Sequence, residues 1–483
     1  MERDLRARFF GAAKAFHPGK RAREVAFHRR SAPQNPEPGT RLHFRELVWP
    51  RRACRFQGWR AKWSRNRDET AGALWTSLSR EALLSSGTFM SQPQESSPQS
   101  LLTGLPTGGS IRYEPCIDGW RAAAAVMVLV AHFFPLREPP NTWMQMGGVG
   151  VTVFFIISGY LITQILFQAK EQVADGRLSK GAALKRFYIR RVLRIAPVYY
   201  ASILAMCLIG SKPMRDYVWW HLTYMTNFGH VFCGIDFRNM VHFWTLAVEE
   251  QFYLVWPLVI LSLARKRVGP AIRWLFASSA ALCVIGGACG LSSYGMIMSL
   301  PIGQPSLALG YGAALAYGRY YEGSGCPRLA RFSLGLGLPF FALSQVVWWW
   351  HGGQPAINFP EYRLLYPWSV TLFFGWLFVR SLNQGSMLNR FLSHPVLRYF
   401  GRISYGVYVY HMLLDGYYYS IWARLGFSPS LSPVAEGFLK SATSILIAAG
   451  SWHFFEKPIL SLKKRWAPDS GTPPRTPRKS PVG

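Results

Sequence analysis

A cation and an imidazole share one apolar segment of the chain, IDGWRAAAAVMVLVAHFFP. Ten residues separate Arg121 from His132, so a helix would place them roughly 16 Å apart along its axis. A titratable side chain within an apolar helix of membrane length is costly, and its default interpretation is a function. We therefore expect His132 to have a functional role. The structural alternative is a helix-packing histidine that hydrogen-bonds across a bundle.

A second apolar segment, HFWTLAVEEQFYLVWPL, carries two consecutive carboxylates, Glu249 and Glu250. Counted from His242, Glu249 lies roughly 10 Å into this segment, at about 1.5 Å of rise per residue. That depth is comparable to the depth of His132, and a buried carboxylate needs a partner. A histidine is a natural partner, so the sequence favours a pairing of Glu249 with His132, with Glu250 in support. A structural tie from Glu249 to an arginine or to backbone donors is the alternative.

A third segment, KRFYIRRVLRIAPVYY, combines basic and aromatic residues. Arg191 and Arg194 are three positions apart, so a helix places both on one face. Two guanidiniums on one face form a fork that suits phosphate oxygens. An ordinary cytoplasmic anchor would explain Arg186 and Arg190 equally well, but it explains the paired arginines less well.

Three further motifs carry weaker signals. In GGVGVTVFFIISGYLIT the small residues favour close helix packing, and Ser158 is no nucleophile elbow because no strand precedes it. GRISYGVYVYHML places Tyr405, Tyr408 and His411 in an apolar segment, where a structural or substrate-positioning role is expected. FFEKP ends the last apolar segment, and we expect Glu456 and Lys457 to form a structural pair there.

These motifs lie on apolar segments long enough, or nearly so, to cross a bilayer of about 30 Å. Half of the residues are hydrophobic and only 16% are charged, which is typical of a polytopic membrane protein. The fold class expected is an all-α bundle of about ten transmembrane helices. Their approximate bounds are 119–137, 147–168, 190–210, 243–264, 273–292, 297–317, 332–350, 363–380, 399–420 and 436–456.

Charge sets the orientation of this bundle. The net charge of +30 falls outside the apolar segments, so it indicates topology and not a nucleic-acid partner. Basic connections at 169–190, 265–273, 318–331 and 381–398 predict that both termini are cytoplasmic. The aromatic stretch YVWWHLTYMTNF within 211–242 suits an interfacial segment on the outer side. Seven cysteines without a CxxC pair indicate neither a disulfide framework nor a metal site.

Three regions follow along the chain. Residues 1–110 are basic and rich in polar residues toward their end, and we expect a disordered cytoplasmic extension; Met90 is an alternative start of translation. Residues 111–460 form the membrane domain. Residues 461–483 are a basic tail that we expect to be disordered.

Taken together, these stretches resemble the acyltransferase 3 family, polytopic membrane enzymes that acylate hydroxyls of cell-surface glycans. The resemblance covers roughly residues 113–458 and rests on the motifs quoted above in their order along the chain. It implies an acyl-coenzyme A donor, most simply acetyl-coenzyme A, with no bound cofactor and no metal. It also implies a carbohydrate or glycolipid acceptor and a multi-pass protein of the inner cell membrane.

The resemblance also implies roles for individual residues. His132 would be the catalytic base, Arg191 and Arg194 would bind the donor, and Arg121 would be a supporting cation. Glu249 would be the acid of the fourth span. The chain departs from the family where an Arg and an Asp commonly precede the sixth span's glycine, because it reads PIGQPSLALG there; no role is carried over to that site.

Several alternatives stay open at this point. Acyl transfer could be direct or could pass through a covalent enzyme intermediate. A membrane transporter or proton-relay protein could use the same intramembrane His and Glu, although the two halves show no clear internal repeat. A non-catalytic membrane scaffold would not need paired arginines facing one way. The sequence identifies neither the acceptor hydroxyl nor the acyl chain nor the oligomeric state.

Overall fold

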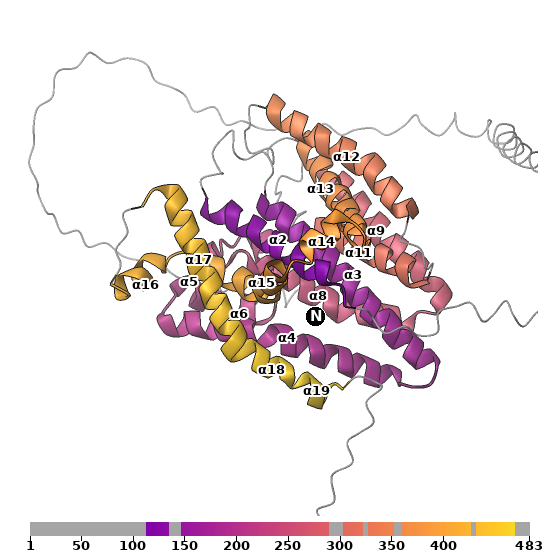
Figure 1. Cartoon of the computed structure of the whole chain (residues 1–483), viewed down its shortest axis with the longest axis horizontal. Coiled ribbons are helices and arrows are strands. Elements are labelled where there is room, and N and C mark those ends of the chain that lie inside the picture. Colours follow the sequence, from indigo (N-terminus) through magenta and orange to yellow (C-terminus); the bar gives the residue numbers. More distant parts are fainter. Residues whose placement is uncertain are drawn as a thin grey trace, which may run out of the picture. The chain divides into compact units, whose positions relative to one another are not determined.

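A computed structural model describes residues 113–134, 146–288, 303–321, 327–351, 360–426 and 431–468. All of them belong to the unit formed by residues 97–483 (Figure 1). The predicted basic extension and the alternative start at Met90 lie outside the described residues.

The described residues contain helices and no strand, which confirms the predicted all-α class. Each predicted apolar segment has a counterpart among the long helices. In chain order these are α2 (Pro115–Phe133), α3 (Met146–Ala174), α4 (Lys180–Ile209), α8 (Phe243–Ser262), α9 (Arg265–Ala288), α11 (Gln304–Tyr321), α12 (Pro327–Trp350), α13 (Pro360–Ser381), α15 (Pro395–Leu413) and α17 (Pro433–Ser451).

Shorter helices fill the connections. The predicted interfacial segment, 211–242, folds into four of them: α5 (Lys212–Asp216), α6 (Val218–Leu222), α7 (Thr226–Cys233) and η3 (Arg238–Met240). The others are α14 (Met387–Leu392), α16 (Tyr418–Arg424), η5 (Trp452–Glu456), α18 (Lys457–Ser461) and α19 (Lys463–Trp466). The tail predicted to be disordered from residue 461 therefore begins with a helix; residues 469–483 lie outside the described part.

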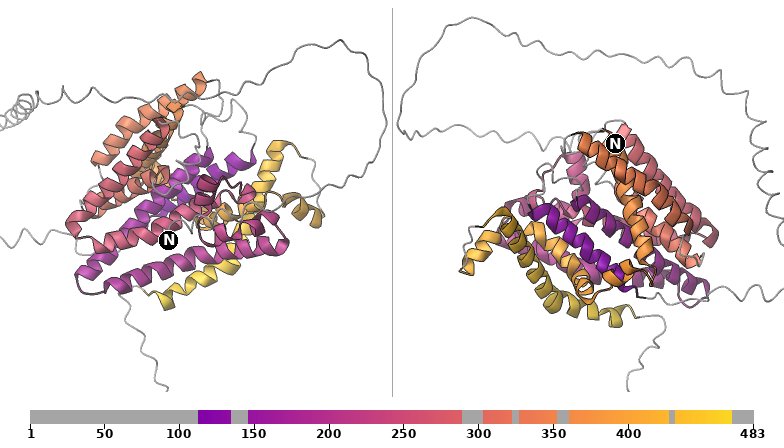
Figure 2. Two further views of the ribbon diagram at one scale, coloured as in Figure 1. Left: turned by 180° about the vertical axis from the view of Figure 1, so that it is seen from behind. Right: turned by 45° about the horizontal axis from the view of Figure 1, so that its top comes forward.

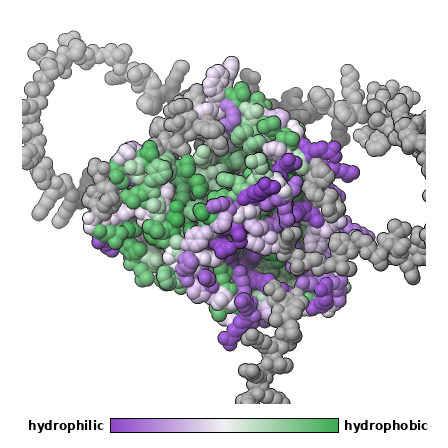
Figure 3. Space-filling view, in the orientation of Figure 1, coloured by the Kyte–Doolittle hydropathy of each residue, from purple (hydrophilic) through white to green (hydrophobic). Residues whose placement is uncertain are grey.

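Five of the described helices are long and apolar enough to cross a membrane. They run over Pro115–Phe133, Met146–Ala174, Lys180–Ile209, Arg265–Gly286 and Arg328–Trp350. Large apolar side chains such as Leu208, Trp274 and Trp350 are exposed on them, as lipid-facing residues would be. Figure 3 shows hydrophobic residues over much of one face, with hydrophilic ones gathered toward one side. The count of ten spans and the orientation stay predictions.

Several helices are longer than their apolar segments. The loop predicted at 169–190 is shorter in the structure, because α3 continues to Ala174 and α4 begins at Lys180. Ser179 caps α4 by accepting a hydrogen bond from the Ala182 backbone N–H. Similarly, the basic residues of the predicted loop 265–273 lie within α9. Hydropathy marks the thickness of the bilayer, whereas Lys, Arg, Glu and Ala extend a helix beyond it.

Helix α3 lies at the centre of the bundle and packs against α2, α8, α11 and α13 (Figures 1 and 2). On its other side α2 packs against α15, which in turn contacts α4 and α17. Glycine permits two of these approaches: a Cβ at Gly159 would collide with the Leu309 carbonyl, and one at Gly401 with the Asp118 carbonyl. Close helix packing at the small residues of α3, as predicted, is therefore confirmed.

Candidate active site

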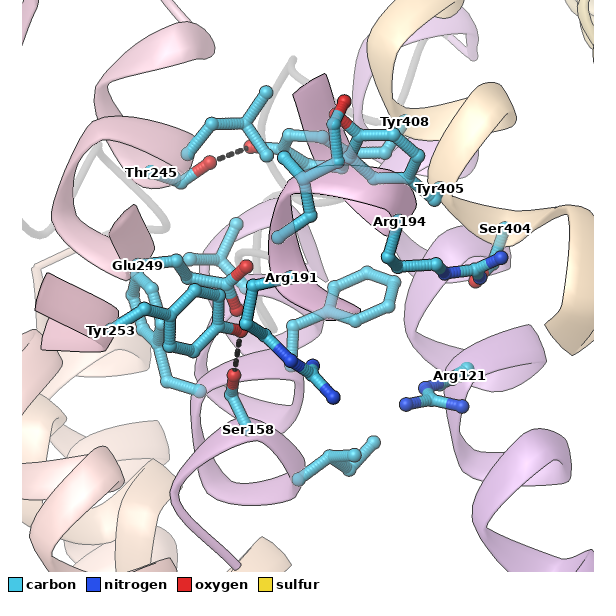
Figure 4. A pocket seen from close by; sticks show the side chains of 16 residues that line it. Arg121, Ser158, Arg191, Arg194, Thr245, Glu249, Tyr253, Ser404, Tyr405 and Tyr408 are labelled. Atoms are coloured by element: carbon cyan, nitrogen blue, oxygen red, sulfur yellow. Dashed lines mark hydrogen bonds between the residues drawn. The ribbon is translucent and has the colours of Figure 1, made fainter. Parts of the chain in front are cut away.

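A pocket opens between α2, α3, α4, α8 and α15, and it encloses about 780 Å³ of space, part of it open to the surroundings. Its walls combine three guanidiniums with one carboxylate and several hydroxyls (Figure 4). The polar and charged lining residues are Arg121, Ser158, Arg191, Arg194, Thr245, Glu249, Tyr253, Ser404, Tyr405 and Tyr408. Analysis of the sequence had singled out seven of these ten: Arg121, Ser158, Arg191, Arg194, Glu249, Tyr405 and Tyr408.

The two paired arginines of α4 both line this pocket, as residues on one helix face should. The Arg191 guanidinium lies over the rings of Phe187 and Tyr253, at 5.8 and 5.9 Å from their centroids. Its Nε is buried, and it has no hydrogen-bond partner among the described residues. Because an unpaired buried donor costs free energy, Arg191 is poised to bind an anion.

Arg194 has a different environment. Its guanidinium lies 5.3 Å from the centroid of the Trp452 ring, and its Nη1 is 3.9 Å from Glu456 Oε2. The predicted pairing of Glu456 with Lys457 is therefore wrong. The π-helical turn η5 presents Glu456 to α4, with the carboxylate 2% exposed. Such turns inside helices are frequent at functional sites.

A third guanidinium reaches the pocket from α2. Arg121 forms an ion pair of 3.0 Å with Asp118, one turn earlier on the same helix. Asp118 also accepts a hydrogen bond from the Tyr113 hydroxyl. Figure 4 shows the guanidiniums of Arg121 and Arg191 pointing toward each other across the pocket. Two cations held face to face are favourable only when an anion lies between them.

Glu249 faces this pocket from α8 and is hydrogen-bonded to Ser158 and Tyr253. The hydroxyls of Ser158 and Tyr253 also bond to each other. Next to this group, Glu250 Oε1 is buried without a hydrogen-bond partner in the described part of the chain. Tyr253 was missed from the sequence, although its spacing of four residues from Glu249 places it on the same helix face.

His132 is not among the residues that line this pocket. It lies in the last turn of α2 and is partly exposed. Its Nδ1 is 2.8 Å from the Val128 carbonyl oxygen. Since a carbonyl only accepts, Nδ1 carries the proton, and Nε2 offers the lone pair of a base. The predicted pairing of His132 with Glu249 is wrong, because Glu249 is bound to Ser158 and Tyr253 instead.

Two other histidines accompany His132. The His411 ring lies 5.0 Å from the His132 ring and 5.2 Å from the His242 ring, centroid to centroid. His411 Nδ1 is 2.6 Å from the Tyr408 carbonyl, and His242 Nε2 is 3.1 Å from the Val409 carbonyl. These three side chains, here called the histidine row, join α2, α15 and the start of α8. No group of three His, Cys, Asp or Glu suited to a metal occurs within the described ranges.

The pocket and the histidine row meet at Tyr408. Its ring centroid lies 5.5 Å from that of His411 and 5.6 Å from that of His242, while its side chain lines the pocket. The Tyr408 hydroxyl is 2.6 Å from Thr245 Oγ1, which donates to the His242 carbonyl. Tyr408 thus links the arginine-lined pocket to the histidine row, in which His411 lies between Tyr408 and the candidate base His132. Tyr405, also in the pocket wall, donates to the Ile195 carbonyl.

The fold and this site define an all-α protein with membrane-length helices, a cationic pocket between five of its helices and a histidine row in contact with the pocket-lining Tyr408. The chain belongs to the acyltransferase 3 family, whose acyltransferase domain matches residues 114–453. This confirms the predicted family.

Named relatives agree with this family. The chain is 27% identical over 394 residues to the peptidoglycan O-acetyltransferase OatA of Listeria monocytogenes, a match covering 72% of this chain and 56% of that protein. It is 26% identical over 382 residues to the O-acetyltransferase OatA of Staphylococcus aureus, covering 72% and 58% respectively. The chain thus spans less than two thirds of the length of these relatives. No solved structure matches the chain.

At the start of α11, where the sequence departs from the family, the structure places Gln304. This side chain is 3% exposed, and its Nε2 lies 3.4 Å from Thr152 Oγ1 of α3. A neutral amide in this place ties two helices together without supplying a charge.

Proposed function

We propose that this protein is a membrane O-acyltransferase that moves an acyl group, most simply acetyl, from acyl-coenzyme A to a hydroxyl of a cell-surface or exported carbohydrate. The observation that carries the proposal is a pocket whose wall holds three guanidiniums and also Tyr408, which contacts the histidine row. The family and the named relatives support acetyl transfer, and the name of the Listeria relative supports a glycan acceptor.

The arginines account for donor binding. Coenzyme A is a polyanion, and guanidiniums bind phosphate oxygens through charge-assisted hydrogen bonds. Arg191 and Arg194 are positioned to hold these phosphates, with Arg121 across the pocket as the supporting cation. Basic loops place this end of α4 on the cytoplasmic side, where acyl-coenzyme A is made available.

The histidine row accounts for the chemistry. His132 Nε2 takes the proton of the acceptor hydroxyl as its oxygen attacks the thioester carbonyl. The new C–O ester bond forms and the C–S bond breaks. Coenzyme A then leaves as a thiol after taking the proton from the His132 imidazolium. For the acyl group to reach His132, it must pass the hydrogen-bonded Tyr408 and Thr245 at the pocket's end.

Glu249 has a revised role in this proposal. Its hydrogen bonds to Ser158 and Tyr253 place it within the donor pocket, where Tyr253 also supports the Arg191 guanidinium. We propose that Glu249 and Glu250 shape the charge of the donor pocket and do not orient His132. Ser158 is a hydrogen-bonding member of the same wall, and Tyr405 and His411 are positioning residues.

Thiol release from acetyl-coenzyme A tests the function. Membranes containing the wild-type chain should release thiol when mixed surface glycans are present, and His132→Ala and the double variant Arg191→Ala/Arg194→Ala should not. His453→Ala and Arg267→Ala are matched controls, because both side chains are exposed and lie outside the pocket lining. Full activity in His132→Ala would overturn the mechanism.

One observation favours a second candidate function. The three neighbouring histidines could pass a proton between α2, α15 and α8, as a transporter or proton-relay protein requires. Absence of thiol release with acetyl, succinyl and longer donors, together with proton uptake by vesicles that depends on His132, would support this alternative.

A further inference from the structure

The end of the described chain folds back against the arginine-bearing helix. Helices α18 and α19 both contact α4, and they run along it in all views (Figures 1 and 2). Arg190 stabilises this contact, because its Nε and Nη2 donate hydrogen bonds to the Ala467 carbonyl oxygen at 3.1 and 2.7 Å. The C-terminal segment therefore lies beside the arginines that line the pocket.

This placement brings a lysine into the arginine cluster. Lys463, in the first position of α19, is half-buried, whereas its neighbours Lys464 and Arg465 are exposed. Burial, together with the charges of Arg191, Arg194 and Arg190, lowers the pKa of the Lys463 ammonium to about 8. Among the described residues, no carboxylate forms an ion pair with Lys463.

Four cations gathered in this way repel one another, and partial burial strengthens the repulsion. Glu456 offsets part of this charge through its pairing with Arg194 at 3.9 Å, and Glu249 and Glu250 offset part of the charge of Arg191. A multivalent anion would relieve the repulsion between Lys463 and the arginines further. A ligand that carries several phosphates along its length can contact more of these cations at once than a single carboxylate can.

We propose that Lys463 is a donor-binding residue, and that the packing of α19 against α4 places its ammonium at the site for the phosphates of the acyl-coenzyme A donor. This inference rests on the proposed function for the identity of the ligand. It assigns to the segment after the last long helix a part in donor binding, in addition to the paired arginines of α4.

Binding of coenzyme A to the purified full-length chain provides the test. Lys463→Gln should weaken binding about tenfold, because it removes a charge-assisted hydrogen bond to a phosphate. Lys463→Arg keeps the charge and should restore most of the affinity. Lys464→Gln is the matched control: it removes the same charge from the neighbouring exposed position and should change affinity less than twofold.

Donors that lack phosphates separate a phosphate contact from a structural effect. If Lys463 binds phosphate, Lys463→Gln should raise the KM for acetyl-coenzyme A about tenfold and leave both kcat and the KM for S-acetylpantetheine unchanged, since phosphate contacts are equally strong in the ground and transition states. Dephospho-coenzyme A, without its 3′-phosphate, then shows which phosphate Lys463 contacts.

The possible outcomes distinguish this inference from the proposed function. Equal affinity of wild type and Lys463→Gln for coenzyme A would overturn the inference, as would an equal loss with S-acetylpantetheine. If the wild-type chain binds coenzyme A in a Lys463-dependent manner but transfers no acyl group, the inference stands and the proposed function fails. If the wild-type chain does not bind coenzyme A, both fail.

Discussion

His132 and His411 lie edge to face, with ring centroids 5.0 Å apart and an angle of 71° between the ring planes. The first ends α2 and the second lies in the last turn of α15, so helix packing alone brings them together. His411 is fully buried, and it fixes one side of the partly exposed His132 ring. This relationship makes α15 part of the candidate active site.

Loss of the His132 imidazole should abolish acyl transfer. General bases contribute about 10²–10⁴-fold to rates, so we expect His132→Ala to lower kcat at least 100-fold with little change in the KM for acetyl-coenzyme A. Thiol release measures the rate. The amount of folded protein, from fluorescence-detected size exclusion, is the control. A kcat within tenfold of wild type would contradict the assignment of His132 as the base.

His411 should affect the rate and not donor binding. His411→Asn can keep the donation to the Tyr408 carbonyl but lacks Nε2 and the ring, whereas His411→Phe keeps a ring and loses the donation. We expect kcat to fall about tenfold or more in both, and the pH profile of kcat to shift because the neighbour of His132 has changed. Unchanged profiles in both variants would leave His411 with a packing role only.

Arg194 and Glu456 should be energetically coupled. Glu456→Gln removes the counter-charge of a largely buried guanidinium, so we expect lower stability, on the order of 1–3 kcal/mol. In a double-mutant cycle with Arg194→Gln, the second substitution should cost less than it does alone. Thermal unfolding in detergent measures each step. Strict additivity of the two losses would show that the pair is not coupled.

Glycine at the α3–α11 contact should not tolerate a methyl group. An alanine at position 159 would meet the Leu309 carbonyl, and forcing the helices apart should cost about 1–3 kcal/mol. Gly335→Ala in α12 is the matched control, because a Cβ there meets nothing within 4 Å. The control should be neutral or slightly stabilising, since alanine favours helix. Equal unfolding temperatures for both variants would contradict this packing.

The affinity for the donor should fall as the pH rises through about 8, where the Lys463 ammonium loses its proton. The KM for acetyl-coenzyme A should increase above that pH in the wild type, and it should stay flatter in Lys463→Arg, because arginine remains charged. The effect on stability has the opposite sign. The unfolded chain binds this proton more tightly than the folded chain does. Without ligand, Lys463 therefore makes the protein more stable as the pH rises from about 8, its pKa in the folded chain, toward about 10.4, the pKa of lysine in an unfolded chain. A KM for the wild type that does not change across this range would contradict the phosphate contact of Lys463.

The sequence by itself determined the all-α class, the family and the helices that carry the candidate residues. It also determined that Arg191 and Arg194 face one pocket, because residues three apart share a face of any α-helix. Apolar length predicted the presence of each long helix but not its ends, since charged residues at the membrane boundary continue α3, α4 and α9.

Tertiary structure alone decided which side chains meet. Glu249 bonds to Ser158 and not to His132, Glu456 pairs with Arg194, and Lys463 joins the arginine cluster. Depth along a helix was the only guide from the sequence, and residues at equal depth can face opposite sides of a bundle. The rotation of each helix about its own axis and the choice of its neighbours depend on packing across the whole bundle, which local periodicity does not encode.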